Sequence, residues 1–113
     1  MAPSIFCAVS PSRLDSFREM VTKNPTNALA HYGLANEAMK ESLYQEAADH
    51  YAAYLGTYDD EGNGFGRYAE ALAELGRLPE AQQALQSGIA AAHRFGHPSM
   101  ASELEVRLES LSD

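Results

Sequence analysis

The sequence predicts an all-α protein, and three observations support that prediction. Apolar residues make up 45% of the 113 residues, and alanine contributes more of this share than valine or isoleucine, which favours helices over strands. Apolar side chains also recur at the spacing of one helix face. The clearest such set is Phe65, Tyr68, Ala69, Leu72 and Leu75. Finally, the chain matches itself at a fixed offset, which indicates a repeated unit.

The repeat has an offset of thirty-four residues. At this offset Glu46-Ala47 aligns with Glu80-Ala81, and Leu34-Ala35 aligns with Tyr68-Ala69. A period of this length is typical of a helical hairpin that stacks on the next one.

These features resemble the tetratricopeptide-repeat family, in particular its small bacterial-type members. Repeats of that family carry a Leu-Gly or Leu-Ala pair in the first helix, an alanine at the start of the second, and a large residue four positions later. The chain provides them at Leu34-Ala35, Ala47 and Tyr51, then at Tyr68-Ala69, Ala81 and Leu85, with the family's Asn-Pro-x-Asn link at residues 24–27. The chain departs from the pattern at residues 58–61, where no proline closes the first full repeat.

The resemblance implies a single domain over residues 11–113, folded as a right-handed helical-hairpin solenoid. It would hold about two full repeats, a leading half-repeat helix and a C-terminal capping helix. Its helices are expected at about 11–23, 26–40, 44–56, 62–76, 79–95 and 98–112, after a flexible tail at 1–10.

Each expected helix has a sequence signal. The first carries Leu14, Phe17 and Val21 on one face, and the 24–27 link separates it from the second. The second, third and fourth contain the repeated positions described above. The fifth has a stripe formed by Ala81, Ala84, Leu85, Gly88, Ile89 and Ala92. The sixth has Met100, Leu104, Leu108 and Leu111 on one face and Ser102, Glu105 and Glu109 on the other, as a capping helix requires.

Glycine and proline mark helix boundaries. Gly56, Gly76 and Gly96 lie where helices are expected to end, because glycine readily adopts the left-handed C-cap conformation. Pro79 and Pro98 fit the first turn of a helix, where the missing N–H has no partner to lose.

Charge and cysteine content exclude several classes of function. The net charge is −8, from sixteen acidic and eight basic residues, so the surface repels nucleic acid and favours a basic or neutral polypeptide. The single cysteine, Cys7, permits no intramolecular disulfide. A free thiol, a start without a signal peptide and the lack of a long apolar run together predict a cytoplasmic protein.

No chemical site is expected. His93 and His97 are four residues apart, a spacing that can bind a metal on a helix, but Gly96 and Pro98 interrupt that helix. His31 and His50 are expected to be isolated from each other on separate helices. Residues 59–70 resemble an EF-hand calcium loop, yet the repeat already assigns residues 65–70 to a helix. We expect no catalytic residue, metal or cofactor, and a plain helix-dipole role for the acids at 59–61.

The expected function is that of an adaptor, in which the first helices of the repeats line a concave groove for a peptide or a partner helix. The groove candidates are Leu29, Tyr32, Asn36, Met39, Lys40, Asn63, Arg67 and Glu70. A basic peptide is the preferred ligand class. Asn36 and Arg67 also fit a carboxylate clamp found in one subtype of the family, but Tyr32 replaces its lysine.

The sequence leaves two alternatives open. In one, Tyr32 and Met39 only pack against the neighbouring helix. In the other, the chain self-assembles as a homodimer through an exposed apolar strip formed by Leu14, Phe17, Met20 and Val21.

Overall fold

A computed structural model gives the structure of this chain and describes residues 12–111. These residues form six α-helices and no strand, which confirms the all-α prediction. The helices are α2 (Arg13–Lys23), α3 (Ala28–Lys40), α4 (Tyr44–Thr57), α5 (Asn63–Glu74), α6 (Leu78–Arg94) and α7 (Pro98–Leu111). The expected tail at 1–10, with Cys7, lies outside the described residues.

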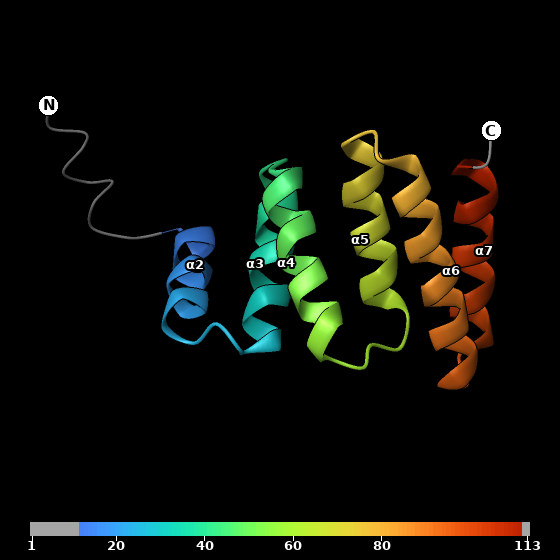
Figure 1. Ribbon diagram of the computed structural model, residues 1–113, viewed down its shortest axis with the longest axis horizontal. Helices are drawn as coiled ribbons and strands as arrows, with labels where there is room; N and C mark the ends of the chain where they lie inside the picture. Colours follow the sequence, from blue (N-terminus) through green and yellow to red (C-terminus); the bar gives the residue numbers. More distant parts are fainter. Residues whose placement is uncertain (1–11, 112–113) are drawn as a thin grey trace, which may run out of the picture.

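The six described helices lie in a row (Figure 1), and each packs mainly against its neighbours in sequence. The molecule is elongated, with extents of 52 × 29 × 20 Å, and α2 and α7 lie at its opposite ends. Alternate helices α3, α5 and α7 contribute to one face. Asn63 of α5 donates a hydrogen bond to the Tyr32 hydroxyl of α3, and Arg107 of α7 lies against Gly66 of α5.

Capping residues explain where several helices begin and end. The Ser12 and Asn27 side chains accept hydrogen bonds from the first turns of α2 and α3, as N-caps do. Gly76 and Gly96 follow α5 and α6 with φ of +77°, which confirms their predicted left-handed conformation.

The predicted left-handed cap at Gly56 is wrong, although α4 ends only one residue later. Helix α4 continues through this glycine to Thr57, and the Tyr58 N–H still donates to the Tyr54 carbonyl at 2.9 Å. A helix interior tolerates glycine at a modest cost, so a glycine in the sequence is not by itself a stop.

Asp60 links α4 to α5 and is 3% exposed. Its carboxylate accepts hydrogen bonds from the backbone N–H groups of Gly62 (2.8 Å) and Gly64 (2.7 Å) and from the Tyr54 hydroxyl (2.6 Å). Burial and the bond to Asp60 raise the pKa of Tyr54 above its usual value. Gly62 has φ of +132°, which favours glycine. The acidic segment therefore caps α5, and residues 63–74 are helix, as the repeat requires, instead of a calcium loop.

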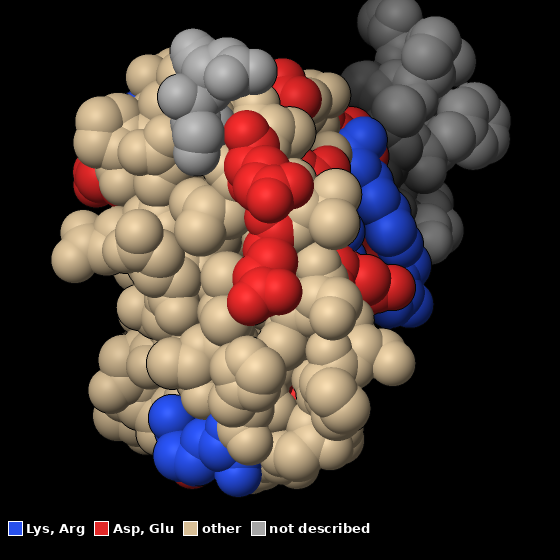
Figure 2. Space-filling view, turned by 90° about the vertical axis from the view of Figure 1, so that its right-hand side faces the viewer, with Lys and Arg blue, Asp and Glu red and all other residues tan. Residues whose placement is uncertain are grey.

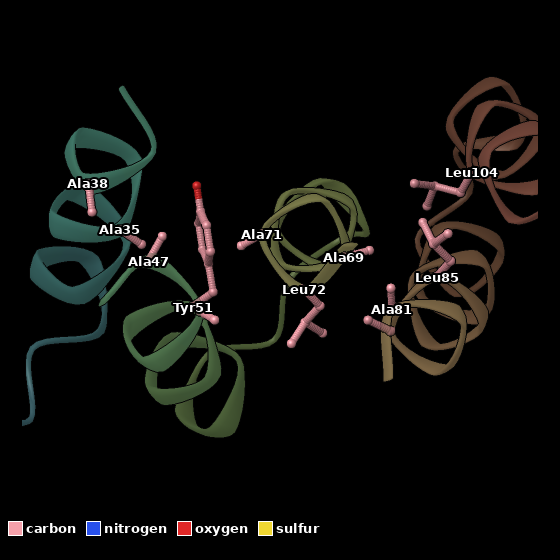
Figure 3. Packing of buried hydrophobic residues seen from close by; sticks show 12 residues of the cluster. Ala35, Ala38, Ala47, Tyr51, Ala69, Ala71, Leu72, Ala81, Leu85 and Leu104 are labelled. Carbon is pink, nitrogen blue, oxygen red and sulfur yellow. The ribbon is translucent and has the colours of Figure 1, made fainter. Parts of the chain in front are cut away.

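The core consists of alanines and a few large side chains, of which Tyr51, Leu34, Leu72 and Leu85 are fully buried. Figure 3 shows Leu85 of α6 and Leu104 of α7 facing each other, and Tyr51 of α4 between α3 and α5. Small residues such as Ala47 and Ala81, both 0% exposed, let successive helices approach closely.

Candidate protein-binding face

The groove face is the surface to which α3, α5 and α7 contribute, and it contains two hollows that meet at α5. The first hollow has a volume of about 450 Å³ and lies among α3, α4 and α5. Its lining is Asn36, Glu37, Met39, Lys40, Tyr44, Tyr51, Arg67 and Glu70. Five of the eight groove candidates predicted from the sequence are therefore brought together. The other three do not line this hollow.

Side chains of α3 and α5 meet across the first hollow. The Asn36 amide oxygen accepts hydrogen bonds from the Tyr51 hydroxyl at 2.5 Å and from Arg67 Nη1 at 3.5 Å. Burial raises the pKa of Tyr51 to about 12, so its hydroxyl stays protonated and able to donate. Asn36 is thus held in place by the fold, whereas Lys40, Arg67 and Glu70 are exposed.

Tyr32 belongs to an aromatic cluster in this structure. Its ring lies 4.5 Å from that of Tyr54 and 5.9 Å from that of Tyr51, measured between centroids. Tyr58 continues the cluster by stacking on Tyr54 at 5.2 Å. Tyr32 is half-buried and accepts a hydrogen bond from Asn63 at 3.1 Å. It therefore packs within the fold, and Leu29, which is 61% exposed, is the more accessible apolar candidate.

The second hollow was not anticipated from the sequence. It has a volume of about 340 Å³ and lies among α5, α6 and α7. Its lining is Gly66, Ala69, Glu70, Ala73, Leu85, Arg107, Ser110 and Leu111. Glu70 lines both hollows.

The repeat offset could have identified Arg107. Met39 lines the first hollow, and the residues thirty-four and sixty-eight positions later, Ala73 and Arg107, line the second. The capping pattern of α7, with polar residues on one face, obscures this signal in the sequence. The outer face of α7 is polar as expected, since Ser102, Glu105 and Glu109 are exposed.

The ion pairs of the molecule are distributed unevenly. Six of the eight basic residues form an ion pair with an acid, namely Arg13, Arg18, Lys23, Lys40, Arg77 and Arg94. In residues 12–111, Arg67 and Arg107 form none. Glu37, in the first hollow, accepts from Lys40 at 3.1 Å and from Arg13 at 3.2 Å, and the bond from Lys40 lowers the pKa of Glu37.

The prediction that His31 and His50 are isolated is wrong. Their Nδ1 atoms lie 2.8 Å apart and their rings stack at 5.1 Å. His31 Nε2 lies 2.7 Å from the Pro25 carbonyl, which can only accept. When both rings are neutral, His31 Nε2–H therefore donates to Pro25 and His31 Nδ1 accepts from His50. Packing of α3 on α4 creates this contact, and neither residue lines the two hollows.

No family model matches the chain, and comparison with curated proteins finds no match. Over residues 12–111, no group of three or more His, Cys, Asp or Glu side chains is placed to hold a metal. None of the described helices is both long and apolar enough to cross a membrane. The arrangement offers exposed hydrogen-bond donors, one exposed carboxylate and apolar walls, which together suit the binding of a polypeptide.

Proposed function

We propose that this chain is a tetratricopeptide-repeat-like helical solenoid in the cytoplasm, which binds another protein and performs no catalysis. The observation that carries the proposal is the first hollow, where residues of α3 and α5 that the repeat register assigns to binding line one depression. The occupant would be an extended peptide or a partner helix. Asn36 and the aromatic cluster are held by internal contacts, so a ligand would meet an organised surface.

An occupant of both hollows would cross α5 at Glu70. On such a path Lys40 and Arg67 offer donors on one side, and Arg107 offers donors on the other. Met39 and Ala73 provide apolar contacts at equivalent positions of the two hollows. The net charge of −8 favours a basic peptide as the partner.

This function is tested by selecting peptides from a random displayed library and then blocking the groove face where the two hollows meet. Glu70→Trp places a large side chain at an exposed position shared by both hollows. Gln83→Trp is the matched control, because Gln83 is also exposed on a helix but lines a separate hollow among α4, α5 and α6. We expect selected peptides to bind the wild type and Gln83→Trp, and to lose binding to Glu70→Trp.

Other outcomes contradict the proposal. Equal binding to both tryptophan variants places the binding surface elsewhere. If no peptide is selected and light scattering shows a dimer, self-assembly replaces the adaptor function. The predicted apolar strip gives limited support to that alternative, since Leu14, Phe17 and Val21 are half-buried and Met20 is 46% exposed.

A further inference from the structure

Arg67 of α5 and Arg107 of α7 both lie on the groove face, where Arg67 lines the first hollow and Arg107 lines the second. Arg67 reaches toward α3, where its Nη1 lies 3.5 Å from Asn36 Oδ1. Arg107 reaches from α7, and a methyl group added at Gly66 would lie only 3.2 Å from its Nη1. Gly66 directly precedes Arg67 in the sequence. The missing side chain at this position therefore leaves room for Leu104 and for the Arg107 guanidinium against α5, one residue before Arg67.

Both arginines are exposed and have unused donor groups. Neither forms an ion pair within the described part of the chain, although every other basic residue does. Two like charges on the same face of the molecule repel each other, and an anionic group between them would relieve that repulsion. A guanidinium presents a planar set of N–H donors that matches the geometry of a carboxylate.

The groove face differs in charge from the rest of this acidic molecule. The two hollows are lined by three bases, Lys40, Arg67 and Arg107, and by two acids, Glu37 and Glu70. Glu37 is already bound by two cations. By contrast, Figure 2 shows acidic side chains in a column over the middle of the α7 end, with basic side chains only toward its right-hand and lower margins.

We propose that the groove face binds an extended protein segment through an acidic side chain of that segment, which lies over Gly66 between Arg67 and Arg107. This inference rests on the proposed function and specifies its ligand. The net charge favours a basic segment, but charges farther away than about 8 Å are largely screened at physiological ionic strength. The local arginines therefore select the residue that binds at this point. Glu70, one turn farther along α5, opposes the same carboxylate.

The peptides selected above provide the probe. Each is resynthesised with acetylated and amidated ends, and each Asp or Glu is replaced in turn by Asn or Gln. We expect one such replacement to weaken binding about tenfold or more in fluorescence anisotropy, because charge-assisted hydrogen bonds are lost.

Variants of the protein locate the effect. Arg67→Gln combined with Arg107→Gln is expected to weaken binding about tenfold, and to abolish the difference between acidic and amide peptides. Lys23→Gln combined with Arg94→Gln is the control, because it also removes two positive charges but at positions outside the hollows. We expect this control to change binding less than about twofold. Glu70→Gln removes the opposing carboxylate and is expected to strengthen binding about twofold. Circular dichroism verifies that each variant keeps its helices.

Three results overturn this inference and leave the proposed function standing. In the first, the selected peptides contain no acidic residue. In the second, the Arg67→Gln/Arg107→Gln variant and the Lys23→Gln/Arg94→Gln variant weaken binding equally. In the third, binding requires a free C-terminal carboxylate on the peptide. If no selected peptide is sensitive to Glu70→Trp, the proposed function itself fails, and this inference fails with it.

Discussion

The two halves of the molecule use their polar side chains differently. In α2, α3 and α4, all four basic side chains form ion pairs within the fold. Arg18 of α2 holds Glu46 of α4 at 2.8 Å, and the histidine pair joins α3 to α4. In α5 and α7, Arg67 and Arg107 make no ion pair within residues 12–111. The first half thus uses its charges for internal contacts, and the second half presents two of them to solvent.

This difference separates stability from binding. A bonded charge stabilises the fold, and its removal leaves a partner without its bond. An exposed charge without an internal partner contributes little to stability and is available to a ligand. Substitutions in the first half should therefore lower stability, whereas substitutions of the two arginines should change binding and leave stability unaltered.

The largest effect is expected at the junction between the halves. Asp60→Ala removes the acceptor for two backbone N–H groups and for the Tyr54 hydroxyl, all in a buried site. We expect a loss of about 3 kcal/mol in the free energy of unfolding, because buried donors are left unsatisfied. Urea unfolding followed by circular dichroism measures it. Asp59→Ala is the control, since its ion pair with Arg94 is exposed and contributes less than about 1 kcal/mol.

A smaller loss is expected from Arg18→Ala in the first half. The variant breaks the two hydrogen bonds that Arg18 donates to Glu46 from Nε and Nη2. Because both side chains are partly exposed, we expect about 1 kcal/mol, measured by the same urea titration. A loss no larger than that of Lys23→Ala, whose pair with Glu19 is exposed, would contradict the comparison.

A pH effect is expected at the histidine pair. Burial first, and the neighbouring His31 second, lower the pKa of His50 below 6.5, although Glu46 and Asp49 act in the opposite direction. As the pH falls below 6.5, the unfolded chain takes up a proton at His50 more readily than the folded chain does. Stability should therefore be complete above that pH and decline below it.

Thermal melts between about pH 7.5 and pH 5.5 measure this decline while carboxylates stay ionised. Both rings are partly exposed, so the change should be smaller than those above. His50→Gln should flatten the profile in this window. An equally steep decline in that variant would place the titrating group elsewhere.

The smallest effect on stability is expected from Arg67→Gln combined with Arg107→Gln. Both side chains are exposed, and neither forms an ion pair in residues 12–111. We expect the free energy of unfolding to change by less than about 0.5 kcal/mol. A loss comparable with that of Arg18→Ala would show that these arginines support the fold, and would remove the contrast between the halves.

The helices could be predicted from the sequence because their signals are local. Apolar spacing, the Asn-Pro-x-Asn link at residues 24–27 and the glycines at 76 and 96 act within a few residues of the boundaries that they set. Each predicted boundary lies within two residues of the observed one. Gly56 differs from the other two glycines because it lies inside α4 and does not form a left-handed cap. At this position the continuing helix overrides the weak preference of glycine for ending a helix.

The sequence by itself therefore determined the all-helical fold, the thirty-four-residue register and five of the residues that line the first hollow. The tertiary structure alone decided that His31 meets His50, that Asp60 is buried under Tyr54, and that Arg107 lies beside Gly66. These contacts join residues on different helices or across a turn. They depend on the angle and depth at which the helices pack, and local spacing carries no information about either.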